Sequence, residues 1–388
     1  MGPAHSQARL IFGWPQLGDV HRRRYLRLLA AGSIAAAGCP DAARAPTPEP
    51  RETGTVAGTE LPVPLSAMRQ PLPRDYIPAI VDPAFGTDWQ GLGGGTRLPA
   101  DAPVIGVTRE GRERAYPIRV LARHEIVNDD LGGPVAVTYC VLCGSGVVFE
   151  RRVAGQPTIF GVSGKLWRSD LVLYDALTDS LWSQLAATAI RGSRTGERLE
   201  FVPSTLTTWG KWGSRHPETE VLLPPPRSRT VGEYDRSFDY ATPKYGYGEE
   251  SQLVGRDSFD GGLHPRTLVV GVAVDGEARA YPFQVVTDEV VVTDRVGDRP
   301  VVVTATPEGR LVAYDRRVDG ETLRFVAADV HHLRADGSRW RRATGEAVDG
   351  PHEGAQLRRA STHPPMFWTG WSEFNPETDV YGIEADGA

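Results

Sequence analysis

The residues with the clearest chemical potential are two cysteines three positions apart, Cys140 and Cys143. Two thiols at this spacing can cycle between dithiol and disulfide, or they can bind a soft metal ion. The third cysteine of the chain, Cys39, ends an apolar stretch near the N-terminus. No competing thiol is therefore expected in the folded part of the protein, and the pair is the main candidate site.

Three kinds of chemistry fit the pair. In a redox dithiol, one sulfur attacks a disulfide or a peroxide and the other resolves the product, with an unknown redox partner or a small-molecule oxidant. A copper or zinc site would need further ligands such as histidine, because the chain has no second Cys-x-x-Cys. A structural disulfide that closes a turn, in a non-catalytic binding module, is the third alternative. No other cofactor is predicted.

Two neighbouring features bear on reactivity. His124 precedes the strand that leads to the cysteines, and it could act as the base that lowers a thiol pKa or as a third metal ligand. Cys143 borders the turn Gly144-Ser145-Gly146. We therefore expect Cys143, more than Cys140, to receive backbone N–H groups, although either sulfur could be the attacking one.

Other polar and aromatic residues have less specific interpretations. Ser169 and Asp170 are expected in the wall of a polar pocket or in a loop. Trp182 and Gln184 could line a ligand groove, but core packing is the preferred interpretation of the tryptophans in this chain.

Short β-branched or alternating segments, bounded by glycine turns, predict a β-rich fold of the α+β class. Strands are expected at 104–107, 114–117, 135–139, 147–152 and 158–162, and short helices at 120–128 and 206–215. The cysteines then occupy a tight turn between two strands. In thioredoxin-like proteins such a pair opens a helix, whereas a strand is expected here after Cys143, so a thioredoxin fold is not predicted.

The second half of the sequence repeats motifs of the first in the same order. Val104-Ile105-Gly106-Val107 matches Val269-Val270-Gly271-Val272, Arg114-Ala115-Tyr116-Pro117 matches Arg279-Ala280-Tyr281-Pro282, and Trp209-Gly210-Lys211-Trp212 matches Trp368-Thr369-Gly370-Trp371. The repeat is much longer than those of solenoid proteins, so it predicts two tandem copies of one sheet-based unit. Opposite the cysteines the second copy has Ala305-Thr306-Pro307-Glu308-Gly309-Arg310, without a thiol.

The N-terminus has the layout of an export signal, with a basic cluster, a short apolar run and a small-residue junction. Arg22-Arg23 followed by Tyr25-Leu26 resembles a twin-arginine motif, and Ala36-Ala37-Gly38-Cys39 resembles a lipobox in which Cys39 is lipidated. The alternatives are an ordinary signal cleaved near Ala37 or an uncleaved anchor. We expect an extracytoplasmic lipoprotein, anchored to the membrane through an N-terminal lipid.

The charge balance argues against nucleic acid as a partner, because the formal net charge is −6 and becomes more negative once the basic leader is removed. The expected organisation follows from the signal, the composition and the repeat. It comprises the export signal with its lipobox (1–39), a flexible tether (40–74), the first repeat (75–225), a linker (226–254) and a degenerate second repeat (255–388).

Several blocks of the first repeat also carry a family resemblance. They are His124-Glu125-Ile126-Val127-Asn128-Asp129, Thr138-Tyr139-Cys140-Val141-Leu142-Cys143-Gly144-Ser145-Gly146, Ser169-Asp170-Leu171-Val172-Leu173-Tyr174-Asp175 and Ser180-Leu181-Trp182-Ser183-Gln184. The chain resembles the DUF3179 family, exported prokaryotic proteins of unknown function, closely over 75–225 and loosely over the second copy. Some members carry selenocysteine within the pair that matches Cys140 and Cys143. The resemblance therefore implies redox chemistry, and a thiol-based oxidoreductase is the activity we expect if the protein is an enzyme.

Overall fold

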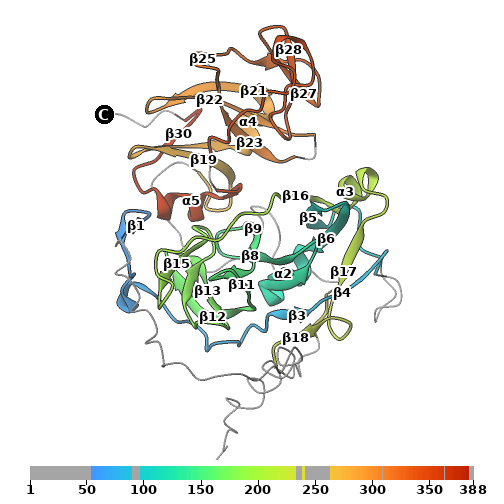
Figure 1. The fold of residues 1–388 in the computed structure, drawn as a ribbon, viewed down its shortest axis with the longest axis vertical. Coiled ribbons are helices and arrows are strands. Elements are labelled where there is room, and N and C mark those ends of the chain that lie inside the picture. Colours follow the sequence, from blue (N-terminus) through green and yellow to red (C-terminus); the bar gives the residue numbers. More distant parts are fainter. Residues whose placement is uncertain are drawn as a thin grey trace, which may run out of the picture. The chain divides into compact units, whose positions relative to one another are not determined.

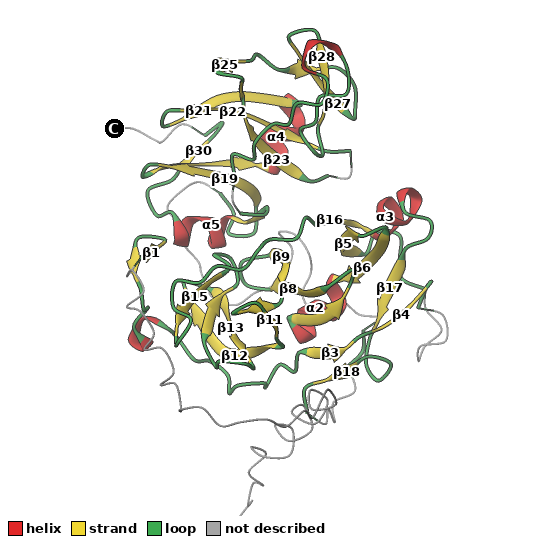
Figure 2. Cartoon of the chain, viewed as in Figure 1, coloured by secondary structure: helices red, strands yellow, loops and turns green. Residues whose placement is uncertain are grey.

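The computed structural model describes residues 54–89, 97–232, 238–240, 263–307, 309–361 and 363–383. These residues form a β-rich α+β fold with few helices, as the sequence predicts (Figures 1 and 2). The helices are α2 (Ile118–His124), α3 (Trp209–Arg215), α4 (Phe283–Glu289) and α5 (Trp368–Phe374), with 3-10 turns η1 (Leu65–Ala67) and η2 (Gly350–His352).

One five-stranded sheet has the order β16-β5-β6-β17-β4. Its strands are β4 (Ala84–Gly86), β5 (Pro103–Arg109), β6 (Arg112–Pro117), β16 (Thr205–Thr208) and β17 (Glu220–Leu223). The β5–β6 hairpin is antiparallel and β17 runs parallel to β6. Trp212 of α3 packs on this sheet at Gly106, where an added Cβ would lie 2.2 Å from the indole. Only glycine leaves room for that ring.

The second five-stranded sheet, of order β18-β3-β7-β8-β9, carries the cysteines. Its strands are β3 (Ile80–Asp82), β7 (Ile126–Asp130), β8 (Pro134–Cys140), β9 (Ser145–Glu150) and β18 (Arg229–Thr230). All seven residues of β8 are buried. An apolar run of this kind is typical of a strand covered on both faces.

A four-stranded antiparallel sheet of order β12-β13-β14-β15 completes the surroundings of the site. Its strands are β12 (Phe160–Trp167), β13 (Asp170–Asp175), β14 (Leu181–Ser183) and β15 (Thr188–Arg191). All six residues of β13 are buried, and its first residue is Asp170. The sheet therefore brings a carboxyl group into the interior.

The C-terminal part contains three further sheets, and two-stranded hairpins occur in both parts of the chain. The sheets are β29-β19-β20-β30, with β19 (Leu268–Val274), β20 (Glu277–Pro282), β29 (Met366–Phe367) and β30 (Asp379–Val380); β21 (Val291–Val296), β22 (Arg299–Ala305) and β23 (Leu311–Asp315); and β26 (Val326–Ala327), β27 (His332–Ala335) and β28 (Ser338–Arg341). The hairpins pair β1 (Thr55–Val56) with β2 (Thr59–Glu60), β10 (Arg152–Val153) with β11 (Gln156–Pro157), and β24 (Arg317–Val318) with β25 (Glu321–Thr322).

The largest buried apolar cluster joins distant parts of the sequence. It includes Cys140, Cys143 and Trp182 from the N-terminal part together with Trp371 and Phe374 of α5. Trp167 and Phe374 pack edge to face, with ring centroids 5.3 Å apart. The two parts of the chain thus share a core beside the cysteines.

The expected helices at 120–128 and 206–215 are both too long at one end. Ile126 and Val127 belong to β7, and α2 ends at His124, before Glu125, whose φ is +56°. Residues Thr205–Thr208 form β16 along β5. In both cases β-branched residues pair with a neighbouring strand, and this tertiary pairing overrides the local helical pattern.

The tether expected at 40–74 ends earlier than predicted. Val63 is fully buried, its N–H donates to Ile190 O at 2.8 Å, and Arg69 bridges to Leu166. Within the linker expected at 226–254, residues Arg229–Thr230 form β18, and Tyr240 is buried. The described parts of both segments therefore pack against the domain.

Candidate functional site

The two cysteines flank a tight turn, as predicted. Cys140 is the last residue of β8 and pairs in register with Ser145, the first residue of β9. Gly144 has a φ of +60°, and a Cβ at this position would lie 2.1 Å from the ring of Phe367. A glycine is needed here both for its backbone conformation and for the contact.

The sulfurs are not exposed to solvent. Cys140 is 2% exposed and Cys143 is fully buried, and both are free thiols. Polar groups nevertheless surround them inside the apolar core. A buried polar cluster of this kind is a strong constraint on the fold, since each group needs a partner.

The hydrogen bonds distinguish the two sulfurs. The N–H of Cys143 donates to Cys140 Sγ at 3.4 Å, and Cys140 Sγ in turn donates to Ser169 O at 3.5 Å. Cys143 Sγ lies 3.1 Å from the hydroxyl of Ser145. The expectation that Cys143 receives the backbone N–H is therefore wrong, because the amide of Cys143 donates to Cys140 Sγ instead.

The pKa of the Cys143 thiol is raised well above its usual value. Burial is the main cause, and the neighbouring Cys140 and the charge of Asp170 add to it. Cys143 is thus held as a protonated thiol near neutral pH, while Cys140 has the N–H donor that a thiolate needs. This asymmetry favours Cys140 as the attacking sulfur and Cys143 as the resolving one.

Asp170 is the acidic residue of the site. Its carboxylate oxygen and the two sulfurs lie within 4.8 Å of one another. The carboxylate accepts hydrogen bonds from the Ser183 hydroxyl at 2.5 Å and from the Leu185 N–H at 3.2 Å. Burial outweighs these bonds and raises the pKa of Asp170 to about 7. The group can therefore hold or release a proton near neutral pH.

Gln184 connects the turn to the neighbouring sheet. Its side-chain oxygen accepts from the Ser145 hydroxyl at 2.8 Å, and its amide donates to Thr138 Oγ1 at 3.0 Å and to Ser145 O at 3.1 Å. The Ser145 hydroxyl donates to Gln184, so its oxygen is left to accept the thiol proton of Cys143. The network fixes Cys143 Sγ in place.

His124 occupies a different environment. Its side chain is fully buried, Nδ1 lies 2.8 Å from Pro78 O, and Nε2 lies 2.7 Å from the hydroxyl of Tyr240. Both ring nitrogens are thus engaged away from the sulfurs. The structure brings Asp170 rather than His124 into the group with the thiols, and a role for His124 as base or ligand stays a prediction.

Helix α5 and the strand before it cover the turn. The N–H of Phe367 donates to Cys143 O at 2.8 Å, and Gly370 approaches Cys143 so closely that an added Cβ would lie 2.6 Å from Cys143 Cβ. Glu373 accepts a hydrogen bond from the Ser169 hydroxyl at 2.9 Å. The C-terminal part of the chain therefore closes the site that the N-terminal part builds.

Sequence reasoning missed Asp170 and Gln184 as members of the site. Both were visible as polar residues beside apolar segments: Asp170 is the first residue of β13, and Gln184 follows β14. Cys39 and the export motifs lie outside the described residues. Among the residues that are described, no helix is both long and apolar enough to cross a membrane.

Comparisons with known proteins complete the description of the site. Neither the curated proteins nor the solved structures contain a match to this chain. A family model described as a protein of unknown function, DUF3179, matches residues 74–378, which include the cysteines, Asp170 and α5. The chain therefore belongs to the DUF3179 family.

Proposed function

We propose that this protein is a thiol-based oxidoreductase in which Cys140 attacks, Cys143 resolves and Asp170 carries the proton between steps. The observation that supports this most is the grouping of two free thiols and a carboxyl group within 4.8 Å of one another. A carboxyl with a pKa of about 7 is suited to accept a proton from a thiol at neutral pH.

The reaction balances with a disulfide as substrate. The Cys140 thiolate attacks one substrate sulfur, the substrate S–S bond breaks, and the first thiolate leaves. The Cys143 thiol then gives its proton to Asp170, and its sulfur attacks Cys140, so the second substrate thiolate leaves and an intramolecular disulfide forms. With a peroxide as substrate, the Cys140 thiolate attacks one peroxide oxygen, the O–O bond breaks, and an alcohol or water leaves, so that Cys140 becomes a sulfenic acid. The sulfur of Cys143 then attacks Cys140, water leaves, and the same intramolecular disulfide forms.

The burial of both sulfurs requires an opening before reaction. Helix α5 contacts the turn through Gly370 and the Phe367 N–H, so its displacement is the most direct route to Cys143. Reaction should therefore be faster with small substrates than with folded protein disulfides, because less of the cover has to move.

The test is to trap the intermediate. In a Cys39→Ser background, Cys143→Ser should accumulate a mixed disulfide with oxidised glutathione, seen by intact mass, since the resolving sulfur is gone. Cys140→Ser should form none or far less. If both variants react only after denaturation, the pair is structural and the proposal fails.

A metal site is the second candidate, and the same group of donors favours it. Cys140, Cys143 and Asp170 offer two sulfurs and one oxygen in a buried site, a set that zinc accepts, while the thiolates alone suit copper(I). A bound metal would act as a Lewis acid, or the protein would serve to store the metal. Elemental analysis should then find one zinc per chain, lost in Asp170→Asn, or one copper per chain, lost in Cys140→Ser. Either metal should be retained in His124→Asn.

We also propose that the protein is exported and anchored through a lipid on Cys39. The basic cluster, the short apolar run and the small residues before Cys39 support this. A Cys39→Ala variant should leave the membrane fraction while keeping its fold. If the Cys39→Ala variant and the unmodified protein associated with the membrane equally, the proposed lipid anchor on Cys39 would be contradicted.

The two halves of the fold are, we propose, copies of one unit. Corresponding side chains make corresponding bonds: Trp212 and Trp371 each donate from Nε1 to a threonine at 2.9 Å. Strand β17 runs parallel to β6, and β30 runs parallel to β20. In the described residues the second copy has no thiol, and it contributes α5, which covers the turn. The first copy would then carry the chemistry, and the second would control access to it.

A further inference from the structure

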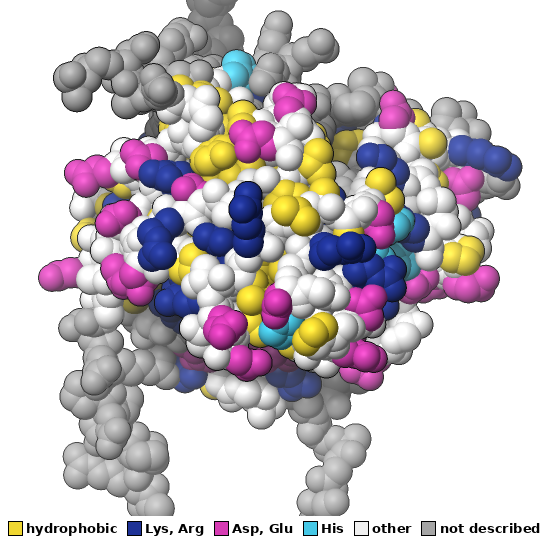
Figure 3. Space-filling model, turned by 90° about the horizontal axis from the view of Figure 1, so that it is seen from above, with side chains coloured by type: hydrophobic (Ala, Val, Ile, Leu, Met, Phe, Trp, Pro, Cys, Tyr) yellow, Lys and Arg dark blue, Asp and Glu magenta, His cyan; other side chains and the backbone are white. Residues whose placement is uncertain are grey.

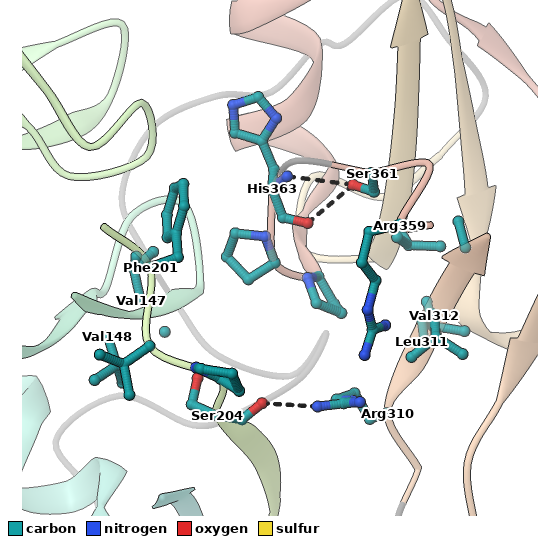
Figure 4. A pocket seen from close by; sticks show the side chains of 17 residues that line it. Val147, Val148, Phe201, Ser204, Arg310, Leu311, Val312, Arg359, Ser361 and His363 are labelled. Carbon is teal, nitrogen blue, oxygen red and sulfur yellow. Dashed lines mark hydrogen bonds between the residues drawn. The ribbon is translucent and has the colours of Figure 1, made fainter. Parts of the chain in front are cut away.

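We propose that a cavity beside β9 binds a small organic anion that carries a carboxylate on an apolar chain. The cavity has a volume of about 250 Å³. Val147, Val148 and Phe201 lie on one side of it, and Arg310, Leu311 and Arg359 lie on the other (Figure 4). Residues from both halves of the sequence are thus needed to form it.

Two arginines bring positive charge to the cavity, and neither is paired with an acidic side chain in the part of the chain that the structure describes. Among the described residues, neither Arg310 nor Arg359 forms an ion pair. Arg310 donates to Ser204 O at 2.9 Å and to Ala343 O at 2.6 Å, and Arg359 donates to the same Ala343 O at 2.9 Å. Carbonyl groups orient the guanidinium groups but do not neutralise them.

The burial of Arg310 and the nearby charge of Arg359 both bear on the ionisation of Arg310. Burial, with the charge of Arg359 in second place, lowers the pKa of Arg310 to about 10. A carboxylate between the two guanidinium groups would relieve the repulsion between them, and the fork of an arginine matches a carboxylate in shape. The positive cavity is also unusual for a chain of net charge −6, and on the face seen in Figure 3 basic and acidic side chains are interspersed.

His363 completes the polar side of the cavity. Burial and the charge of Arg198 lower the pKa of its imidazole to about 4, so the ring is neutral near pH 7. The ring therefore adds no charge to the cavity. The Ser361 hydroxyl beside it already donates to His363 O at 2.9 Å.

The remaining wall determines the class of anion. Val147, Phe201, Leu311 and Pro364 are apolar and would be in contact with a hydrocarbon chain. Inorganic phosphate or acetate would leave this wall uncovered. A carboxylate with a chain of a few carbons would pair with the arginines and also contact the apolar wall. A larger ligand would exceed the volume of the cavity.

The cavity is connected to the thiol turn through two segments. Its wall begins at Gly146, next to the Ser145 that contacts Cys143. On the other side, Pro365 lies two residues before Phe367, whose N–H donates to Cys143 O. The binding test below involves no redox step, so its outcome is independent of the proposed function.

The experiment measures binding of hexanoate to the purified protein by calorimetry at constant ionic strength. Hexanamide, which has the same chain without the charge, should bind about tenfold or more weakly, and acetate should also bind more weakly. Arg359→Gln should weaken hexanoate binding about tenfold. Arg310→Lys, which keeps the charge but not the planar fork, should weaken it to a lesser degree.

Arg358→Gln is the matched control. Arg358 is adjacent in sequence, its side chain is 74% exposed, and it lies 3.5 Å from Asp315 rather than in the cavity wall. This variant should bind hexanoate like the unmodified protein. Equal binding of hexanoate and hexanamide, or equal losses in the Arg358 and Arg359 variants, would overturn the proposal.

Discussion

A carboxyl group enclosed with two thiols must either keep its proton or carry an unbalanced charge into the core. Asp170 is fully buried, and no arginine, lysine or histidine is among the causes that shift its pKa to about 7. Its partners are the Ser183 hydroxyl and backbone N–H groups. Hydrogen bonds of this kind stabilise the carboxylate only in part, so the proton is retained over much of the acidic range.

Stability should therefore fall as the pH rises from about 4 to about 7. The pKa of Asp170 is raised in the folded state from 3.8 to about 7, so in this window the unfolded chain releases the proton and the folded chain keeps it. The contribution is on the order of 4 kcal/mol, since one pKa unit corresponds to about 1.4 kcal/mol. Urea unfolding at a series of pH values measures it.

The matched variant for this prediction is Asp170→Asn, which keeps the size of the side chain and cannot ionise. Its unfolding free energy should vary less between pH 4 and pH 7 than that of the unmodified protein. Identical pH profiles for the two proteins would mean that Asp170 does not retain its proton in the fold.

The sequence revealed only part of this site. The cysteine pair could be recognised because both sulfurs lie in one short motif. Asp170 could not be assigned to it, because the contact depends on how β13 packs against the turn after β8, which no local pattern encodes. His124 was the nearest histidine in the sequence, but proximity along the chain did not bring its ring nitrogens to the sulfurs.

At the scale of elements, the contact between α5 and the turn depends on one glycine. A methyl group in Gly370→Ala would overlap Cys143, whose Cβ lies 2.6 Å from the added atom. We expect a loss of about 1–3 kcal/mol in the free energy of unfolding. The displaced helix should also expose the thiols, so iodoacetamide should modify Cys143 faster than in the unmodified protein.

Gly213→Ala provides a control in α3, the other short helix with a tryptophan motif. Nothing lies within 4 Å of a Cβ at Gly213. Alanine is favoured over glycine in a helix by up to about 1 kcal/mol, so this variant should be as stable or slightly more stable, with unchanged thiol reactivity. If iodoacetamide modified the thiols faster in both variants, the change in thiol reactivity could not be attributed to the contact between α5 and the turn.

The elements themselves were largely predictable where their pattern was local. The strands that became β5, β6, β8 and β9 were expected from alternation and from glycine turns. The errors occurred at β7 and β16, where β-branched residues next to a short helix pair with distant strands. Helix boundaries depend on such pairing, which the sequence does not display.

At the scale of the molecule, two similar ion-pair groups occur in the two halves. Asp129 is bonded to Arg114 at 2.7 Å and to the Tyr116 hydroxyl at 2.6 Å. Asp294 is bonded to Arg279 at 2.9 Å and to the Tyr281 hydroxyl at 2.8 Å. The side chain of Asp129 is 4% exposed and that of Asp294 is 16% exposed, so water screens the second group more.

Asp129→Asn should therefore destabilise the protein more than Asp294→Asn. Removing one partner of a buried pair costs about 3–5 kcal/mol, whereas about 1–2 kcal/mol is expected for the more exposed pair. Denaturant unfolding of both variants measures the difference. Equal losses would indicate that the two groups experience the same screening despite their different burial.

The bond from the Phe367 amide to Cys143 O has a kinetic consequence. Deuterium can replace that amide proton only when the bond opens, and the same event should admit a reagent to the sulfur beneath it. The opening free energies from amide exchange and from thiol modification should then agree. A thiol that reacts more often than the amide exchanges would reveal a separate channel to the sulfur, one that bypasses the cover.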